Sequence, residues 1–341
     1  MSKPNILLIY TGGTIGMIRD SETVSLRAFD FKNLLSKIPE LQLLDCRIET
    51  ISFQEPIDSS NMSPDKWVQI AEIIESNYEV FDGFVVLHGS DTMSYTSSAL
   101  SFMLENLAKP VIFTGSQLPI GDLRTDAKEN LMTSIQLASL QQDKKPIITE
   151  VCLYFEYKLY RANRTTKINA ENFEAFASPN FPELAESGVH LKVNHSHLWK
   201  PIKNEQLKVH KVLNCNIAIL KLFPGITKSL LDAVLGSSGL KGVVLETFGA
   251  GNCSTDSWFV NSLKEAIIKG IHIINVTQCT SGSVMMGHYE TSNQLLEIGV
   301  ISGKDITTES AVCKLMYLLG KDIPVKDFKG KYELSLRGEM L

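Results

Sequence analysis

The sequence lacks the features that mark membrane, secreted and metal-binding proteins. It has no apolar run that approaches the ~18 residues of a membrane-spanning helix. The short apolar run after Lys3 is followed by Gly-Gly-Thr and not by a small-residue cleavage site, so we expect no secretory signal. The six cysteines stand singly, without a C-x-x-C pair or a histidine at metal-ligand spacing. We therefore expect a cytoplasmic protein with reduced thiols, no membrane partner and no metal.

Several familiar enzyme motifs are also missing. The chain contains no G-x-x-x-x-G-K-[ST] phosphate loop, no H-E-x-x-H zinc motif and no G-x-S-x-G nucleophile elbow. Gly12, Gly13 and Gly16 do not fit the spacing of a dinucleotide fingerprint. The net charge of −5 is mild and gives no electrostatic reason to expect nucleic acid as a partner. We therefore expect neither a cofactor nor a nucleic-acid partner.

The first half of the chain alternates short apolar runs with helical patterns. Strands are predicted over 6–10, 47–52, 83–88, 110–114 and 147–154, and helices over 63–76, 97–106 and 127–140. Ser63 and Pro64 suit the N-cap and first position of the first of these helices. Strands that are apolar on both faces and alternate with helices indicate an α/β fold, with a mostly parallel sheet flanked by helices.

The same pattern restarts in the second half after a polar interruption. From about residue 184 to 209 the chain is polar and carries His190, His195 and His197, which we expect to be solvated. Strands are then predicted over 217–222, 242–247 and 271–277, and helices over 228–235, 257–269 and 308–319. At roughly 150 residues per domain, 341 residues suit about two domains. We predict a larger N-terminal α/β domain over 1–190, a linker over 191–212 and a smaller C-terminal α/β domain over 213–341.

Polar, hydroxyl-rich segments follow four of the predicted strands, over 11–16, 56–62, 88–93 and 114–117. A structural turn needs Gly, Asn or Asp, but it does not need a hydroxyl side chain at every strand end. Because the carboxyl ends of parallel strands meet at one edge of a sheet, these segments predict a single polar site. Lys167, just past the fifth strand, is a candidate base for that site; the alternative is a solvated surface lysine.

Two of these segments resemble the signatures of a known family. TGGTIG (residues 11–16) and GFVVLHGSDTM (83–93) resemble the two signatures of the bacterial-type L-asparaginases. DSSNM, TGSQ, NRTTK, FGAGN and TQCTSG fall at matching places, so the likeness runs essentially from end to end, and it favours the cytoplasmic, type I branch. The resemblance implies hydrolysis of L-asparagine to L-aspartate and ammonia through a threonine nucleophile and an acyl-enzyme, with weaker use of L-glutamine.

The resemblance also implies a role for each matched catalytic residue. Thr14 matches the nucleophile that attacks the side-chain amide carbon, and Ser90 stands where the family has a second catalytic threonine. Asp91 matches the residue that receives the substrate α-ammonium, and Lys167 matches the lysine paired with that carboxylate. A lysine paired with a carboxylate stays charged. Our hypothesis is that the substrate ammonium competes for Asp91, after which Lys167 gives up its proton more readily.

The remaining matched residues bind substrate. Ser59 matches the group that receives the α-carboxylate, and the same pocket is lined by Asp58, Ser60 and Ser116. The family forms homotetramers, dimers of dimers in which a neighbouring chain completes each site, and Asn252 is the residue assigned to that contribution. The resemblance therefore implies a homo-oligomer that acts on a small amino acid.

Three positions depart from the family pattern. Ser90 replaces a threonine, which keeps the hydroxyl but loses the methyl group that stiffens the side chain. The stretch 17–27 is interpreted as a lid beside Thr14, the alternative being a surface hairpin. It contains no tyrosine, and Val24 lies near the place where many relatives have one. Glu246 stands where some cytoplasmic relatives use an arginine to bind an activating asparagine, so we expect no such activation.

Two other functions are compatible with the same scaffold. One is an amino-acid sensing protein whose site is weakened by the missing tyrosine and by Ser90. The other is the subunit that supplies ammonia to a tRNA-linked amidotransferase. It is disfavoured because no extension precedes TGGTIG and no basic patch is evident.

Overall fold

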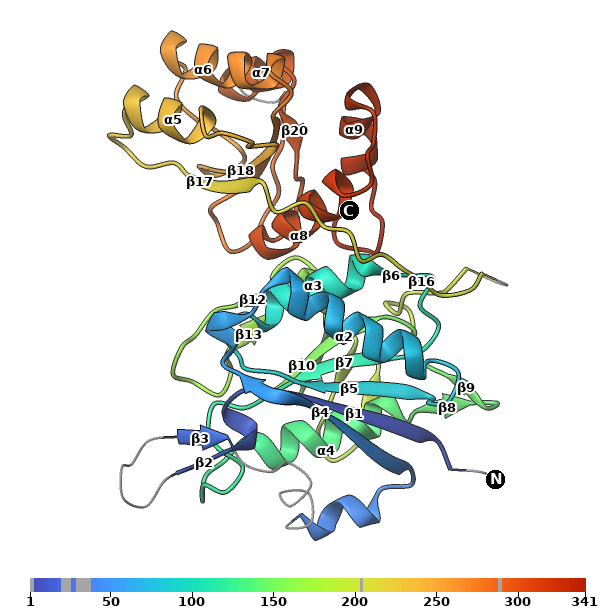
Figure 1. Cartoon of the computed structure of the whole chain (residues 1–341). Helices are drawn as coiled ribbons and strands as arrows, with labels where there is room; N and C mark the ends of the chain where they lie inside the picture. Colours follow the sequence, from blue (N-terminus) through green and yellow to red (C-terminus); the bar gives the residue numbers. More distant parts are fainter. Residues whose placement is uncertain (1–2, 20–25, 29–37, 203–204, 288–289) are drawn as a thin grey trace. The chain divides into compact units, whose positions relative to one another are not determined.

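The computed structural model describes residues 3–19, 26–28, 38–202, 205–287 and 290–341. They form two compact units that divide between Lys211 and Val212. Each unit is an α/β structure, which confirms the predicted fold class (Figure 1). Among the described residues, no helix combines the length and the apolar character needed to cross a membrane.

The first unit is built on an eight-stranded sheet with the order β15-β14-β11-β10-β7-β5-β1-β4. Its parallel part consists of β1 (Asn5–Gly12), β4 (Arg47–Ile57), β5 (Gly83–Leu87), β7 (Val111–Thr114) and β10 (Val151–Phe155). Strands β5, β7 and β10 are buried throughout, as expected for a parallel sheet covered on both faces. The carboxyl ends of the parallel strands therefore share one edge.

Helices cover both faces of this sheet (Figure 1). On one face lie α2 (Pro64–Asn77) and α3 (Met93–Met103), which are joined by a hydrogen bond from Trp67 Nε1 to Thr96 Oγ1 of 3.0 Å. On the other face, α4 (Ala127–Ala138) packs Leu131 and Ile135 into the core that contains Ile6 of β1. The strand ends are thus fixed by a core on each side.

The sheet continues beyond β10 with short antiparallel strands that sequence patterns did not predict. These are β11 (Lys158–Arg161), β14 (Ala185–Glu186) and β15 (Lys192–Val193). Other short elements of the first unit are η1 (Thr14–Gly16), β2 (Met17–Arg19), β3 (Leu26–Ala28), η2 (Pro39–Leu43), η3 (Ser59–Asn61), β6 (Leu104–Glu105), β8 (Gln141–Gln142), β9 (Lys145–Pro146), η4 (Ala162–Arg164), β12 (Thr166–Lys167), β13 (Phe176–Ala177) and β16 (Lys208–Val209), where η denotes a 3-10 turn.

The structure differs from the predicted linker over 191–212, because the described residues of that segment up to Lys211 belong to the first unit and two parts of the segment pair with its strands. Strand β15 pairs with β14, and β16 pairs with β6. The buried side chains of Glu150 and Arg161 form an ion pair of 2.6 Å. The same two groups bind the segment, since Glu150 Oε1 accepts from the Trp199 N–H and Arg161 Nη2 donates to the carbonyl of His197. The polar composition of the segment gave no sign of these two contacts, because the segment makes them with backbone groups, the Trp199 N–H and the His197 carbonyl.

The second unit is built on a four-stranded parallel sheet. In order, its strands are β17 (Ile217–Lys221), β18 (Gly242–Thr247), β19 (His272–Thr277) and β20 (Ile301–Ser302). Its helices are α5 (Lys228–Leu235), α6 (Ser257–Ile268), α7 (Glu290–Glu297), α8 (Thr308–Leu319) and α9 (Val325–Tyr332). Leu231 of α5 and Phe259 of α6 pack against Val243 of β18 in one core.

The predicted helices and strands are present, but α7, α9 and β20 were not predicted, and several bounds differ. Helix α3 begins at Met93 instead of 97, and β10 begins at Val151 instead of 147. The side chain of Ser63 occupies the N-cap position of α2 but makes no capping hydrogen bond. The early start of α3 adds Ser94 and Thr96 to the helix, and both side chains are buried.

A buried ion pair holds the C-terminal residues of the second unit against α8. Lys314 Nζ binds Glu339 Oε1 and donates to the Leu334 carbonyl at 2.6 Å, and both charged side chains are completely buried. Glu339 also accepts backbone N–H donations from Leu336 and Arg337. Desolvation lowers the pKa of Lys314, and the carboxylate of Glu339 opposes that shift. The carboxylate is therefore fully paired only while Lys314 is present.

Replacing Lys314 by Met should strongly destabilise the second unit, because it leaves the Glu339 carboxylate buried without its counter-charge. We expect a loss of about 3 to 5 kcal/mol, measured as a lower urea midpoint in chemical unfolding. The double variant Lys314→Met, Glu339→Gln removes both charges and should recover part of that loss. A single variant that unfolds at the wild-type urea concentration would show that the pair does not hold the tail.

Candidate active site

The carboxyl ends of four parallel strands bring the predicted polar segments together in the first unit. The contacts are close enough to require glycine at two positions. A β-carbon on Gly13, where φ is +85°, would lie 2.5 Å from the Gly89 nitrogen, and one on Gly89 would lie 2.5 Å from Ser59 Oγ. Residues 13, 59 and 89 come from the ends of β1, β4 and β5. The structure therefore joins these three strand ends in one site.

The two threonines of the first turn have different environments. Thr11 is buried and its Oγ1 donates to the carbonyl of Leu87 at 2.9 Å, which links β1 to β5. Thr14 is only partly buried and begins the 3-10 turn η1. It follows Gly13, whose backbone touches Gly89, so it lies next to the segment that carries Ser90. Thr14 is therefore the threonine of this turn that is available to a bound molecule.

Three of the predicted catalytic residues form a direct hydrogen-bonded group. Lys167 Nζ lies 2.8 Å from Ser90 Oγ and 2.7 Å from Asp91 Oδ1. The Asp91 side chain is 61% exposed, whereas that of Lys167 is 18% exposed. Lys167 is therefore not a solvated surface lysine: its ammonium group is held between a hydroxyl and a carboxylate, and the carboxylate still faces solvent.

Packing between η4 and α3 places Lys167. Asn163 Nδ2 donates to Ser101 Oγ at 2.7 Å, and Thr165 Oγ1 lies 3.2 Å from Ser94 Oγ. The chain then enters β12, where Lys167 pairs with Phe176 of β13. The small polar side chains on α3 allow η4 to lie directly against the helix, so the lysine reaches the strand-end site.

The segment after β4 supplies the predicted substrate-binding side chains. Ser59 is buried, and its carbonyl accepts a hydrogen bond of 2.7 Å from Thr92 Oγ1, which ties it to the Ser90 segment. Asp58 and Ser60 are exposed, and the Asp58 side chain accepts from the Ser60 N–H at 2.9 Å. Ser59 therefore lies inside the site, with Asp58 and Ser60 at its rim.

The turn after β7 is held by Asp126, the N-cap residue of α4. The Asp126 carboxylate accepts from the backbone N–H of Gln117 at 2.9 Å and of Leu118 at 3.1 Å. Burial raises the pKa of Asp126, and these N–H donations oppose the shift. Ser116 is buried and its Oγ donates to the carbonyl of Leu118 at 2.6 Å, so its hydroxyl is used within the turn.

Sequence reasoning named the segments of His88 and Gln117 but gave these residues no role. His88 is completely buried; its Nδ1 lies 2.6 Å from the Gly89 carbonyl, and burial lowers its pKa to about 4. It is therefore neutral near pH 7 and fixes the peptide that precedes Ser90. Gln117 Oε1 accepts from Ser90 Oγ at 3.2 Å. The sequence showed Gln117 inside a polar turn, which could have marked it as a site residue. Its partner Ser90 could not be identified in this way because it lies 27 residues away in the chain.

The other predicted residues lie in the second unit or outside the described residues. Asn252 belongs to a turn of the second unit in which its backbone pairs with Phe248. Glu246 accepts from Thr308 Oγ1 at 2.6 Å and lies 3.6 Å from Lys221 Nζ. Strands β2 and β3 pair antiparallel to each other, with β2 directly after η1, but Val24 lies outside the described residues.

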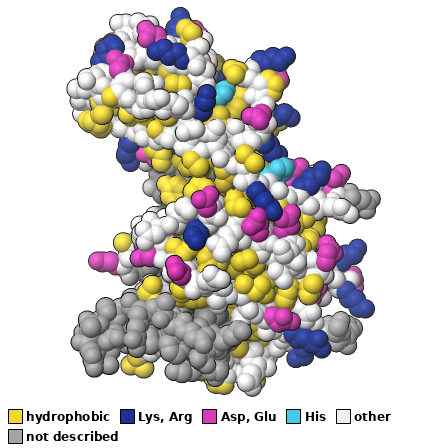
Figure 2. Space-filling view, viewed as in Figure 1, with side chains coloured by type: hydrophobic (Ala, Val, Ile, Leu, Met, Phe, Trp, Pro, Cys, Tyr) yellow, Lys and Arg dark blue, Asp and Glu magenta, His cyan; other side chains and the backbone are white. Residues whose placement is uncertain are grey.

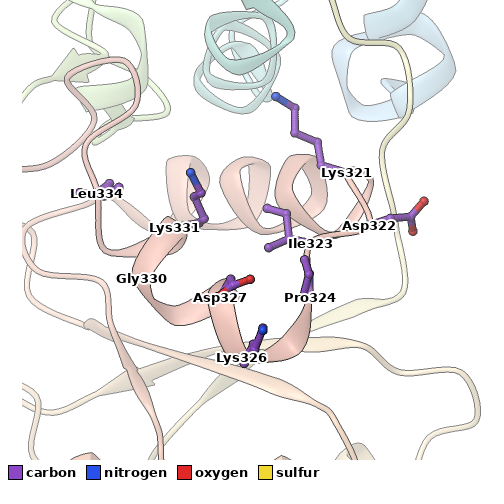
Figure 3. Close-up of a pocket in the computed structure, with 9 residues that line it drawn as sticks. All are labelled: Lys321, Asp322, Ile323, Pro324, Lys326, Asp327, Gly330, Lys331 and Leu334. Carbon is purple, nitrogen blue, oxygen red and sulfur yellow. The ribbon is translucent and has the colours of Figure 1, made fainter.

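Pockets in the two units differ in their relation to this site. In the first unit, a pocket of about 450 Å³ adjoins Gln117 and is also lined by Arg124 and residues 170–173. In the second unit, a hollow of about 620 Å³ is lined by residues of α9 and the turn before it, and none of the predicted site residues lines it (Figure 3). Acidic and basic side chains are interspersed on the face seen in Figure 2, in keeping with the mild net charge.

The assembled groups suit acyl transfer. They comprise an accessible threonine hydroxyl, a second hydroxyl in contact with a lysine, and a partly exposed carboxylate. A hydroxyl with a basic side chain in hydrogen-bond reach is a recurring arrangement for attack on a carbonyl carbon, and here Ser90 has such a partner in Lys167. Within the described part of the chain, no cluster of His, Cys, Asp and Glu side chains could hold a metal ion.

Two family models match the chain in succession. The N-terminal asparaginase model matches residues 5–199, and the glutaminase/asparaginase C-terminal domain model matches residues 216–330. The first covers the unit that contains the hydrogen-bonded group, and the second covers most of the other unit.

Individual relatives agree with these models. L-asparaginase 1 of Escherichia coli (strain K12) is 41% identical over 341 residues, which is 100% of this chain and 99% of that protein. The crystal structure of L-asparaginase I from Vibrio cholerae O1 biovar eltor str. N16961 superposes with a TM-score of 0.90 at 38% identity and 100% coverage of both chains. That of a probable cytoplasmic L-asparaginase from Campylobacter jejuni gives 0.81 at 26% identity, with 97% and 99% coverage. The chain therefore belongs to the asparaginase family, as its two signature segments predicted.

Proposed function

We propose that this protein hydrolyses the side-chain amide of L-asparagine to L-aspartate and ammonia. The observation that carries the proposal is the contact of Lys167 with Ser90 and Asp91, beside the turn that presents Thr14. Full-length similarity to a relative named L-asparaginase 1 supports the same reaction.

The reaction proceeds in two acyl-transfer steps. Thr14 Oγ attacks the amide carbon, the C–N bond breaks, and the threonine proton ends on the departing ammonia. Water then attacks the resulting ester, which releases L-aspartate and restores the Thr14 hydroxyl. An amide is a poor electrophile, so the first step needs an activated nucleophile and a proton for the leaving group.

The charged ends of the substrate select a free amino acid. Asp91 is 61% exposed and uses Oδ1 for Lys167, so its other oxygen can receive the substrate α-ammonium. Ser59, beside Gly89, receives the α-carboxylate. With both ends held, one extra methylene displaces the amide carbon from Thr14, and such displacement is costly. Asparagine should therefore be preferred, with weaker glutamine use.

Lys167 changes role when substrate binds. In the structure its ammonium group is stabilised by the Asp91 carboxylate. The substrate ammonium competes for that carboxylate, and the lysine then loses its proton more readily. The amine formed in this way accepts a proton from the hydroxyl of Ser90.

The family resemblance extends the proposal to assembly and location. We infer a cytoplasmic homo-oligomer, a dimer of dimers in which Asn252 of a neighbouring chain completes each site. The relative from Campylobacter jejuni that is described as cytoplasmic supports the location.

Thr14→Ala should abolish ammonia release from asparagine, with kcat reduced by about 10³-fold or more because the nucleophile is lost. Coupled detection of ammonia over a range of asparagine concentrations measures this. Thr11→Val is the matched control: it removes a buried hydroxyl of the same turn and should lower stability while kcat stays within about threefold. Full activity in Thr14→Ala would exclude Thr14 as the nucleophile.

Lys167→Met should reduce kcat by about 10²- to 10⁴-fold, the usual contribution of a positioned base. The acidic limb of the remaining kcat profile should disappear, because in this mechanism that limb reports protonation of the lysine in the enzyme–substrate complex. A pH–rate profile with its acidic limb unchanged would contradict the role of Lys167.

Ser90→Thr should retain kcat within about threefold, since threonine keeps the hydroxyl and only restricts its rotation. Ser90→Ala, which removes the hydroxyl that contacts Lys167, should lose most of the activity. If both variants were equally inactive in the ammonia assay, the hydroxyl would not be the feature that matters at this position.

A further inference from the structure

Gln117 joins Ser90 to a neighbouring backbone segment through three hydrogen bonds. Its Oε1 lies 3.2 Å from Ser90 Oγ, and its Nε2 donates to the carbonyls of Ala170 at 3.3 Å and Asn172 at 3.0 Å. Its own backbone N–H is held by Asp126. Gln117 is therefore anchored at both its backbone and its side chain, and its side chain is hydrogen-bonded to Ser90 of the catalytic group.

The orientation of the Gln117 amide follows from these partners. Backbone carbonyl oxygens only accept hydrogen bonds, so the NH₂ group must face Ala170 and Asn172. The amide oxygen is consequently the atom that faces Ser90. This settles the assignment of oxygen and nitrogen that is otherwise ambiguous for a glutamine side chain.

The direction of the hydrogen bonds at Ser90 follows in turn. A charged lysine can only donate, so Ser90 Oγ accepts from Lys167 Nζ at 2.8 Å. The single proton of the hydroxyl then points to the amide oxygen of Gln117. Donation runs from Lys167 to Ser90 and from Ser90 to Gln117, and each bond in such a chain strengthens the next.

We propose that Gln117 is a positioning residue that holds the proton of Ser90 away from Lys167 and so stabilises the charged, resting form of the lysine. A neutral Lys167 can accept from Ser90 only after the hydroxyl turns away from Gln117. Gln117 and the lysine therefore compete for one proton. This inference rests on the proposed function only for its effect on turnover; the proton arrangement itself follows from the contacts.

Other charged groups surround this chain of hydrogen bonds and remain in place when Gln117 is replaced. They are Asp91 on Lys167, Asp126 on the Gln117 backbone, and Arg124 and Glu171 in the adjoining pocket. Gln117→Met keeps the length of the side chain but removes its acceptor, whereas Gln117→Glu keeps an oxygen towards Ser90 and adds a negative charge. The two variants should therefore shift the Lys167 equilibrium in opposite directions.

The test is the pH dependence of Lys167 labelling by trinitrobenzenesulfonate, which reacts with amines and not with ammonium groups, read by peptide mass spectrometry. The pH of half-labelling should fall by about half a unit in Gln117→Met and rise in Gln117→Glu. Thr125→Val, which removes another hydrogen bond to the same turn without contacting Ser90, should match the wild type. The inference would be overturned if the pH of half-labelling of Lys167 were unchanged in Gln117→Met, or if it shifted equally in both Gln117 variants. If Gln117→Met does not fold, a pH of half-labelling that does not rise in Gln117→Glu overturns the inference.

Turnover gives a second readout that separates this inference from the proposed function. In Gln117→Met, the acidic limb of the kcat profile for asparagine should move to lower pH because Lys167 then loses its proton more readily, while KM changes less than about twofold and the plateau value of kcat does not fall. An acidic limb at its wild-type position would overturn the inference. A wild-type protein that releases no ammonia would overturn the proposed function instead, while the labelling experiment still decides the role of Gln117.

Discussion

The contact of Lys167 with Ser90 and Asp91 is the interaction on which the site depends. It joins residues 77 and 76 positions apart, at distances of 2.8 and 2.7 Å. The two segments meet because η4 packs against α3 through small polar side chains, with Asn163 bound to Ser101. The parallel sheet fixes the start of α3, and the η4 segment then places the lysine. If η4 did not pack against α3, Lys167 would not reach Ser90, and the Ser90 hydroxyl would lack its charged partner.

The regular helices and strands could be predicted because the pattern of apolar residues within each segment indicates which of its faces are buried. Strands such as β5 and β7 are apolar on both faces, and helices such as α5 and α8 coincide with their predicted ranges. The antiparallel strands β14 and β15 have two residues each, which is too short for any periodicity. The segment 191–212, which contains β15, was predicted as a linker because several of its contacts use backbone atoms, as in the bond from the Trp199 N–H to Glu150.

The site could be predicted in part for a similar reason. Hydroxyl-rich segments at successive strand ends were visible in the sequence, and the parallel sheet brings 13, 59 and 89 together. Family resemblance gave roles to Thr14 and Lys167, and the different surroundings of Thr11 and Thr14 agree with that choice. Gln117 and His88 received no role because their functions depend on hydrogen-bond direction and on burial. Neither property can be read from residue type alone.

The central claim is that Thr14 becomes acylated by asparagine, and trapping that ester tests it most directly. Protein mixed with asparagine can be quenched in acid during the first turnovers, digested and mapped by mass spectrometry. The prediction is an aspartyl ester on Thr14 that appears before steady state and decays when substrate is exhausted. An ester found on Ser90 or Thr11, or ammonia released without any covalent intermediate, would contradict the proposed mechanism.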